Sequence, residues 1–317
     1  MTDAVSVRAH AKVNPALRVL GRRDDGYHEL ETVLVALELA DVVTVREAAG
    51  GGVTVRTTGP RASSDIVDGP DHLAARGAAL ALEVLGSSAG LEVVVEKHVP
   101  SRAGLGGGSS DAAAAALAAL TLLGPADGAA RDALRERCAA ALGALGADCP
   151  FFLHGPTLAT GAGLGAGRGD ELVALPAPDW ELLLVTPDVA CSTPAVYQAM
   201  TDAERGSAPV GIDAARELLA AGAEAARGAL VNDLAPAAAR AEPGLAAWTQ
   251  LLHGAGLDHA LLAGSGSSHF ALFPPGTGDA ERARDRVLAA ADARGLTPRL
   301  CEVTGVAGCT LTPLDRV

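Results

Sequence analysis

The segment from Pro100 to Ala112 reads Pro-Ser-Arg-Ala-Gly-Leu-Gly-Gly-Gly-Ser-Ser-Asp-Ala. Glycine carries no Cβ, so successive backbone N–H groups of such a loop can turn inward and surround an anion. An apolar strand candidate, Leu91–Val99, precedes the loop, and an alanine-rich helix candidate, Asp111–Leu123, follows it. The N-terminus of that helix would place its partial positive charge at the same anion. The arrangement predicts a phosphate-binding loop, because a Gly/Ser linker would not normally be bracketed by a strand and a long helix.

Two common nucleotide-binding patterns do not fit this loop. A Walker A loop requires Gly-Lys-Ser/Thr, which the segment lacks. A dinucleotide-binding fingerprint needs a third glycine at the position that Ser109 occupies. Ser109 and Ser110 instead offer hydroxyls to a phosphate or a magnesium ion. The second glycine-rich stretch, Gly161–Gly169, is followed by no apolar helix, so we expect a turn in a hairpin there.

Composition excludes several classes of protein. The chain has 317 residues, 49% of them apolar, and its 25 basic and 38 acidic residues give a net charge of −13. Such a charge repels polyphosphate backbones, so no nucleic-acid partner is expected. The longest apolar run, Ala112–Leu123, is shorter than the ~20 residues of a membrane span, and Met1–Asn14 lacks the apolar block of a signal peptide. The five cysteines, an odd number, favour a reducing compartment. We therefore expect a cytoplasmic protein that is not associated with a membrane.

Strand and helix candidates intermix along the chain without the regular alternation of a doubly wound sheet, which favours an α+β fold. A strong strand candidate, Trp180–Pro187, follows a change in pattern. We therefore predict two domains, residues 1–178 and 179–317. Further helices are expected at about residues 71–85, 132–145, 193–203, 213–226, 244–254 and 280–294, and strands at 5–13, 31–39, 41–46, 52–57, 259–263, 269–273 and 299–303.

Two segments near the N-terminus carry candidate binding residues. Lys12 is one of only two lysines, and it alternates with apolar residues near a strand end. Its ammonium could meet a phosphate or a substrate oxygen there, although an ordinary surface lysine remains the alternative. Tyr27 and His28 follow a turn, Asp24-Asp25-Gly26, and a ring beside a two-nitrogen hydrogen bonder suits recognition of a base or sugar. A ring packed over a hairpin is the alternative.

Two later signals are weak when taken alone. Asp148, in Gly-Ala-Asp-Cys-Pro-Phe-Phe, stands between a helix and an apolar segment, where its carboxylate would either project into a cleft or cap a helix. The segment Ala-Gly-Ser-Gly-Ser-Ser at 263–268 lies between two apolar runs. It is either a tight turn or a second loop that touches phosphate.

Together and in this order, these segments resemble the GHMP kinase superfamily, whose motifs are an N-terminal lysine segment, a Pro-x-x-x-Gly-Leu-Gly loop and a late Gly-Ser-Gly turn. The Ala-Lys-Val-Asn, Gly-Tyr-His-Glu-Leu and Ala-Asp-Cys-Pro-Phe-Phe segments and the triple glycine are similar to the family of bacterial and plastid kinases of 4-diphosphocytidyl-2-C-methyl-D-erythritol, in the non-mevalonate isoprenoid pathway. The resemblance runs from about Val7 to Pro313. It implies a ribosomal-protein-S5-like, nucleotide-binding and catalytic first domain and a ferredoxin-like α/β sandwich as the substrate-binding second domain.

The resemblance also implies roles for individual residues. Asp148 would be the general base, and Lys12 would keep Asp148 ionised and stabilise the developing alkoxide. The acceptor would be the 2-hydroxyl of a cytidine diphosphate derivative, with ATP and Mg²⁺ as cofactors and no residue assigned to the metal. The implied ATP-binding residues are His72 (where the family usually has asparagine), Lys97, Pro100, Gly104, Leu105, Gly106, Gly107, Gly108, Ser109 and Ser110. The implied substrate-binding residues are Asn14, Tyr27, His28, Thr193, Tyr197, Gly264, Ser265 and Gly266.

Three other interpretations compete with this one. Another GHMP kinase, acting on mevalonate, homoserine or a sugar, would have no base to stack on Tyr27 and His28. A non-catalytic nucleotide-binding regulator would be indicated by loss of Lys12 or Asp148, but both are present. A dinucleotide-binding oxidoreductase is disfavoured by the missing third glycine. A monomer and a homodimer both remain open, as does whether Asp111 touches the metal or, as we expect, caps the helix that follows the loop.

Overall fold

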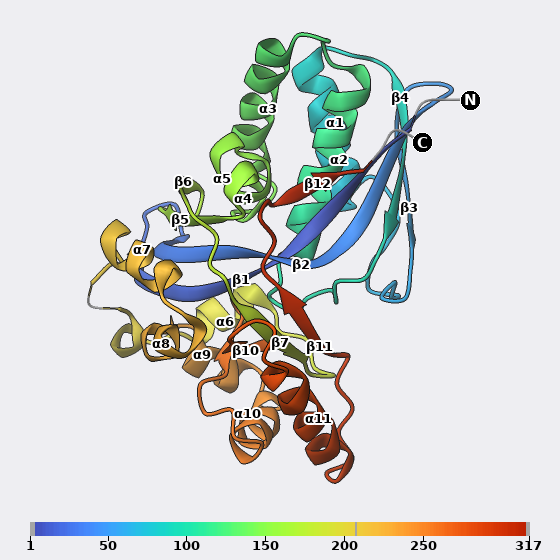
Figure 1. The fold of residues 1–317 in the computed structure, drawn as a ribbon. Helices are drawn as coiled ribbons and strands as arrows, with labels where there is room; N and C mark the ends of the chain where they lie inside the picture. Colours follow the sequence, from blue (N-terminus) through green and yellow to red (C-terminus); the bar gives the residue numbers. More distant parts are fainter. Residues whose placement is uncertain (1–3, 207, 315–317) are drawn as a thin grey trace.

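A long β-hairpin forms the backbone of the first sheet in this computed structural model, which describes residues 4–206 and 208–314. Strands β1 (Ala4–Arg22) and β2 (His28–Ala48) pair antiparallel along most of their length. The turn between them includes Gly26 at φ +87°, a left-handed conformation that glycine adopts without strain. Figure 1 shows the hairpin, in blue, crossing the middle of the molecule.

The first sheet also takes in strands from the last third of the chain. Its path is β12-β1-β2-β4-β3, with β5 attached to β2, β6 attached to β5, and β8 attached to β1. The strands β8 and β12 both pair with β1, so the chain returns to its starting sheet near its end (Figure 1). The further strands are β3 (Gly52–Thr58), β4 (Gly90–Glu96), β5 (Ala162–Ala166), β6 (Glu171–Leu175), β8 (Val231–Asn232) and β12 (Leu311–Pro313).

A layer of helices packs against this sheet. The longest, α2 (Gly107–Leu123), is sandwiched so tightly that Ala112 through Ala116 are fully buried. Its neighbour α1 (Leu73–Leu85) approaches closely, because a Cβ on Gly77 would lie 2.1 Å from the carbonyl oxygen of Ala112. The layer is completed by α3 (Gly128–Leu142), α4 (Cys149–Leu153) and α5 (Gly155–Thr160). This packing fixes the N-terminus of α2 relative to the sheet.

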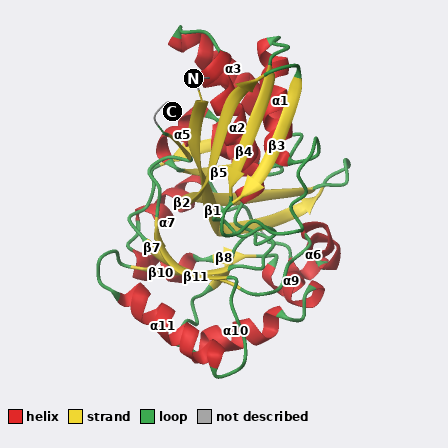
Figure 2. Cartoon of the chain, turned by 90° about the vertical axis from the view of Figure 1, so that its right-hand side faces the viewer, coloured by secondary structure: helices red, strands yellow, loops and turns green. Residues whose placement is uncertain are grey.

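The second sheet has the order β11-β7-β10-β9, with every neighbouring pair antiparallel. Side chains of its central strand β7 (Glu181–Thr186) alternate between two cores: Leu182 and Leu184 pack with residues of the first sheet, whereas Leu183 and Val185 face the helices α10 and α11. Figure 2 shows these two helices on the outer side of the sheet. The remaining bounds are β9 (Leu261–Leu262), β10 (His269–Phe273), β11 (Leu300–Gly305), α10 (Leu245–Gly254) and α11 (Asp279–Asp292).

Four short helices connect the two sheets. They are α6 (Thr193–Ala199), α7 (Ile212–Ala220), α8 (Ala223–Ala226) and α9 (Ala235–Ala241), with single 3₁₀ turns at Asp202–Glu204 and Arg227–Ala229. The expected α+β fold is confirmed. The second sheet's first strand begins just after residue 178, but because β8 and β12 join the first sheet, the two-domain division remains a prediction.

The structure corrects three local expectations. The stretch predicted to be a turn, Gly161–Gly169, contains strand β5, and only its last residues turn. Its glycines are needed for close pairing, because a Cβ on Gly165 would lie 2.5 Å from the carbonyl oxygen of Gly169. The helix after the first glycine loop begins at Gly107, four residues before the expected Asp111, so part of the loop is the first helical turn. The predicted helix at 213–226 is interrupted and forms α7 and α8.

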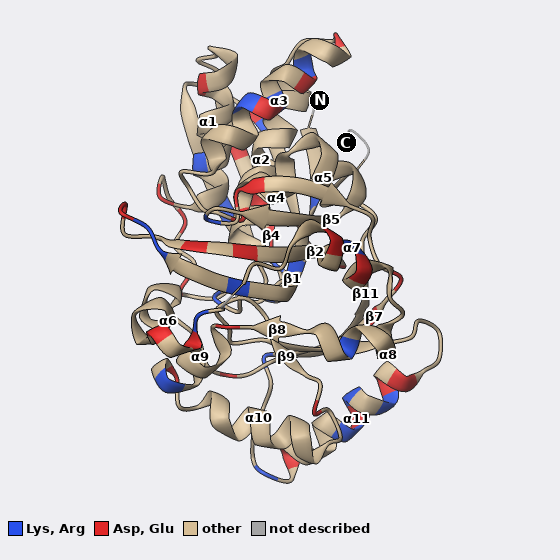
Figure 3. Cartoon of the chain, turned by 90° about the vertical axis from the view of Figure 1, so that its left-hand side faces the viewer, with Lys and Arg blue, Asp and Glu red and all other residues tan. Residues whose placement is uncertain are grey.

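Acidic and basic residues are interspersed on α3 and α11 in the view of Figure 3. Within residues 4–206 and 208–314, no helix is both long enough and apolar enough to cross a membrane. All five cysteines are free.

Candidate active site

Lys12 lies at an irregular point of β1, where the register with β2 shifts between residues 10 and 12. Such irregularities re-aim a side chain. The ammonium, with a side chain only 5% exposed, donates to Oδ1 of Asn14 at 2.8 Å and to the carbonyl oxygen of Gly104 at 3.0 Å. It also forms an ion pair with Oδ2 of Asp148 at 3.2 Å. Lys12 therefore joins the first strand, the glycine loop and the candidate base.

Asp148 holds the N-cap position of α4, directly after a turn at Gly146. Its side chain makes no capping hydrogen bond, so the capping alternative is wrong. The carboxylate faces Lys12 on one side and remains 34% exposed. A carboxylate that is oriented by an ammonium and still accessible can accept a proton from a bound hydroxyl.

The two glycine-rich turns contact each other. Gly104 and Gly106 have φ values of +76° and +70°, which only glycine adopts readily. A Cβ on Gly104 would lie 2.0 Å from the carbonyl oxygen of Ala263, at the start of the late Gly-Ser-Gly turn. A Cβ on Gly264 would in turn approach the Gly104 carbonyl oxygen to 3.1 Å and Nζ of Lys12 to 3.2 Å. The late turn therefore belongs to the same site as the loop.

Features of the loop suit an anion. Helix α2 begins at Gly107 with Gly106 as its N-cap, and no side chain caps its first N–H groups. Ser110 Oγ is buried and has no hydrogen-bond partner within the described part of the chain. Substitution at Gly107 or Gly108 would place a Cβ against Val99 or Leu73, which gives the triple glycine a packing reason as well.

Lys97 lies beneath the loop in a buried ion triad. Its ammonium donates to Oδ2 of Asp41 and, at 2.7 Å, to Oδ2 of Asp111, and all three side chains are almost fully buried. Asp41 also accepts from the backbone N–H groups of His98 and Val99. The two carboxylates raise the pKa of Lys97 against the effect of burial, and burial raises the pKa of Asp111 to about 7. The expectation that Asp111 caps its helix is wrong, because it lies inside the helix.

His72 also contributes to the structure beside the loop. It is the N-cap of α1, and its Nδ1 accepts from the N–H of Ala74 at 3.1 Å. Since Nδ1 accepts, Nε2 carries the proton and donates to Oγ1 of Thr57 at 3.3 Å. Burial lowers the pKa of His72, which keeps the ring neutral. The ATP binding that the resemblance implies for His72 and Lys97 remains a prediction.

Tyr27 and His28, the pair expected to recognise a base or sugar, lie at the end of the long hairpin, where His28 meets Tyr197 of α6. The rings of His28 and Tyr197 stack with centroids 4.8 Å apart and an interplanar angle of 29°. Tyr27 is 59% exposed, and the guanidinium of Arg168 lies 5.3 Å from its ring centroid. Burial raises the pKa of the Tyr197 hydroxyl, and the negative charge of Asp148 raises it further, so the hydroxyl stays protonated. The structure thus brings Tyr197, which the resemblance implies as a substrate-binding residue, beside the Tyr27-His28 pair.

The other predicted substrate residues already have partners within the chain. Asn14 is buried, with Oδ1 on Lys12 and Nδ2 donating to Oγ1 of Thr32 at 2.8 Å. It therefore orients Lys12. The hydroxyls of Thr193 and Ser265 share a hydrogen bond of 2.8 Å, which joins α6 to the late glycine turn.

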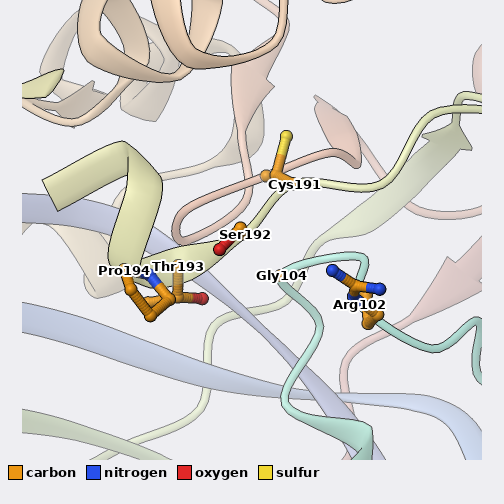
Figure 4. A pocket seen from close by; sticks show the side chains of 7 residues that line it. Arg102, Gly104, Cys191, Ser192, Thr193 and Pro194 are labelled. Carbon is orange, nitrogen blue, oxygen red and sulfur yellow. The ribbon is translucent and has the colours of Figure 1, made fainter. Parts of the chain in front are cut away.

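Three charged residues of this region were not predicted from the sequence. Asp41 anchors Lys97, Arg168 covers Tyr27, and Arg102 lines a cavity at the loop (Figure 4). Asp41 stands between two apolar strand segments, and a charged residue in such a position is a sequence signal that could have identified it. No local pattern marked the two arginines, because their positions depend on segments distant in sequence.

Comparison with known proteins identifies the family. Residues 72–156 match the family described as GHMP kinases N terminal domain. The chain is 38% identical over 274 residues to the 4-diphosphocytidyl-2-C-methyl-D-erythritol kinase of Desulfitobacterium hafniense strain Y51, which covers 85% of this chain and 87% of that relative. This chain belongs to the 4-diphosphocytidyl-2-C-methyl-D-erythritol kinase family. The member from Pelotomaculum thermopropionicum is 37% identical over 284 residues, 88% of this chain and 91% of its own.

Solved structures agree with this family and with the fold. A crystal structure of 4-(cytidine 5'-diphospho)-2C-methyl-D-erythritol kinase has a TM-score of 0.70 at 33% identity and covers 96% of this chain and 99% of its own. A homoserine kinase from Cytophaga hutchinsonii has a TM-score of 0.71 at 19% identity, with 99% and 98% covered. The second likeness shows the fold alone. The expected GHMP kinase fold is therefore confirmed.

Proposed function

We propose that this protein transfers the γ-phosphoryl group of ATP to the 2-hydroxyl of 4-diphosphocytidyl-2-C-methyl-D-erythritol, giving the 2-phosphate and ADP, in the non-mevalonate isoprenoid pathway. The observation that carries the proposal is the ion pair between Lys12 and Asp148, which lies against the glycine loop. The stacked His28 and Tyr197 support a nucleoside acceptor.

Asp148 acts as the general base. It accepts the proton of the acceptor hydroxyl while that oxygen bonds to the phosphorus, so the negative charge passes from the carboxylate to the developing alkoxide. Lys12, held by Asn14 and Gly104, stabilises this charge without having to move. In-line positioning and charge neutralisation are the main requirements of phosphoryl transfer.

The nucleotide site is proposed on the loop from Gly104 to Ser110. Uncapped N–H groups at the start of α2 and the unpaired Ser110 hydroxyl suit phosphate oxygens and Mg²⁺. Mg²⁺ neutralises phosphate charge when bound. No group of three His, Cys, Asp or Glu side chains that could hold a metal occurs in residues 4–206 and 208–314. We infer that the metal takes most of its ligands from phosphate and water.

The setting is proposed to be the cytoplasm, with small-molecule substrates and no nucleic-acid partner. Five free cysteines fit a reducing compartment. The net charge of −13 disfavours a polyanionic macromolecule as partner.

The decisive experiment compares wild-type protein with Asp148→Asn. Wild-type protein should phosphorylate the cytidyl substrate, and Asp148→Asn should lose a factor of ~10³ in kcat while ADP binding stays unchanged. Asp132→Asn, which removes an exposed carboxylate on α3, is the matched control. Wild-type turnover by Asp148→Asn would exclude the general base. Turnover of mevalonate or homoserine without turnover of the cytidyl substrate would exclude the proposed acceptor.

A further inference from the structure

Tyr27 is the one aromatic side chain that the described part of the chain leaves mostly uncovered. Its exposed fraction is 59%, whereas the phenylalanines and tryptophans are buried and Tyr197 is half-buried. It lies in the turn that joins β1 to β2, directly before His28. A single exposed ring is common on protein surfaces, so the groups that support the ring decide whether it has a role.

The support of this ring is the guanidinium of Arg168. Its Cζ atom lies 5.3 Å from the Tyr27 ring centroid, within the ~6 Å at which a guanidinium attracts the face of an aromatic ring. Arg168 belongs to the turn between β5 and β6. Figure 1 shows this turn next to the blue tip of the hairpin, and the N–H of Leu30 donates to the carbonyl oxygen of Gly167 at 2.8 Å. One face of the ring therefore rests on a cation that comes from a different hairpin.

The guanidinium is itself fixed in place. Its Nη2 donates to Oδ2 of Asp170 at 2.5 Å and to the carbonyl oxygen of Gly143 at 3.3 Å, and its Nε donates to the same carboxylate oxygen at 3.1 Å. Gly143 is the C-cap of α3, where carbonyl oxygens lack partners within the helix. Arg168 is thus bound by its own turn and by the end of α3, and it cannot turn away from Tyr27 without losing these bonds.

A cation held on one face changes what the ring can bind. The guanidinium draws electron density toward itself and lowers the negative charge of the opposite face, which favours offset stacking of another flat ring there. A ring that is already fixed also loses less side-chain freedom when a ligand binds. Arg168 supplies both effects, whereas a guanidinium that served the Asp170 pair alone could form that pair while it pointed into solvent.

We propose that Arg168 is a positioning residue for the acceptor, because it holds Tyr27 as a fixed platform on which the base of the acceptor stacks. The inference rests on the proposed function and extends it to the turn between β5 and β6. Arg168 acts through the ring and touches neither a phosphate nor the ATP. Its removal therefore weakens every ligand that carries the base and leaves the phosphoryl transfer step intact.

The first test is steady-state kinetics of Arg168→Met, which keeps an unbranched side chain without the charge. We expect the KM for the cytidyl substrate to rise about fivefold, with kcat and the KM for ATP within about twofold of wild type. As inhibitors, CDP and cytidine should weaken by the same factor, because both carry the base. Arg168→Lys keeps a cation without the planar fork, so we expect a KM about threefold above wild type. Arg46→Met, which removes a guanidinium paired with Glu92 at the other end of β2, should leave every value at its wild-type level.

A double-mutant cycle shows whether Arg168 acts through the ring. Tyr27→Leu should raise the KM for the cytidyl substrate about tenfold, because it removes the stacking surface. In that background, Arg168→Met should raise the KM by less than about twofold, because no ring remains to be held. The chain has two tyrosines, so protein labelled with fluorotyrosine gives two fluorine NMR resonances, which Tyr197→Phe assigns. Arg168→Met should shift the Tyr27 resonance alone, which a general loss of stability would not do.

Four results would overturn the inference. The first is an unchanged KM for the cytidyl substrate in both Arg168→Met and Arg168→Lys. The second is weakening of CDP without weakening of cytidine, which would mean that Arg168 contacts a phosphate. The third is a rise of about fivefold that persists in the Tyr27→Leu background. The fourth is a fall in kcat and melting temperature with an unchanged KM, which would make Arg168 purely structural. Because wild-type turnover of the cytidyl substrate is measured first, failure of the proposed function is seen separately from failure of this inference.

Discussion

Replacing Lys97 with methionine tests the buried triad beneath the loop. Removal of one partner from a buried ion pair costs about 3–5 kcal/mol, because the remaining charge is uncompensated. Asp41 keeps two backbone N–H donors after the substitution, which places the expected loss near the lower end of that range. Asp111 has no such support, since its Oδ2 loses Lys97 and its Oδ1 has no hydrogen-bond partner among the described residues. We expect Lys97→Met to lower the free energy of unfolding by about 3 kcal/mol at pH 7.

The pH dependence makes this prediction specific. In the wild type, the pKa of Asp111 is raised to about 7 in the folded state, so its contribution to stability is greatest at acidic pH and is lost as pH rises through 7. In Lys97→Met the missing ammonium raises this pKa further, so the loss continues above pH 7. The stability difference between variant and wild type should therefore grow by up to about 1.4 kcal/mol per pH unit above pH 7.

Urea unfolding of both proteins at pH 6.0, 7.0 and 8.5 measures these differences. Arg46→Met is the control, because its pair with Glu92 is exposed and should contribute less than ~1 kcal/mol. The double variant Lys97→Met/Asp111→Asn should show no growth of the difference above pH 7. A loss below ~1 kcal/mol at pH 7, or a difference that shrinks as pH rises, would refute the account of the triad.

Three further predictions concern the loop and the substrate side. Gly104→Ala should lower the free energy of unfolding, measured in urea, by about 3 kcal/mol. Alanine is strained at φ +76°, and its Cβ would meet the carbonyl oxygen of Ala263. A free energy of unfolding within ~1 kcal/mol of the wild-type value would contradict the close contact. Asn14→Ala should reduce kcat about tenfold in steady-state assays with little change in either KM, because it removes a hydrogen bond that orients the Lys12 ammonium. A change in KM alone would instead indicate that Asn14 contacts the substrate. Tyr197→Ala should raise the KM for the cytidyl substrate about tenfold, whereas Tyr197→Phe should keep the wild-type KM. An equal rise in KM in both variants would show that the hydroxyl matters more than the ring.

Much of the site could be predicted because its motifs are local. The glycine loop between a strand and a helix, the lysine segment and the Tyr-His pair each occupy a few consecutive residues whose chemistry is visible in the sequence. Helix boundaries were less predictable. Gly107 and Gly108 have the sequence character of loop residues, yet they begin α2. Glycine occurs at these two positions because a Cβ would meet the side chains of Val99 or Leu73.

Residues that act through distant partners could not be placed in this way. The resemblance implies ATP binding for Lys97, but no local pattern predicts that its ammonium is bound by Asp41, 56 positions earlier, and by Asp111. The assignment of Asp111 as a cap failed because α2 begins four residues earlier, at Gly107, which places Asp111 inside the helix.

The sequence by itself determined the α+β class and the family and indicated the candidate reacting groups, because these follow from short motifs and their order. The tertiary structure alone decided which groups meet. Lys12 and Asp148 are separated by 136 positions and form an ion pair because β1 and the turn before α4 converge at the loop. Arg102 acquires its cavity because the segment before α6 folds over the same loop. A local pattern specifies what a residue can do, whereas long-range packing specifies what it can reach.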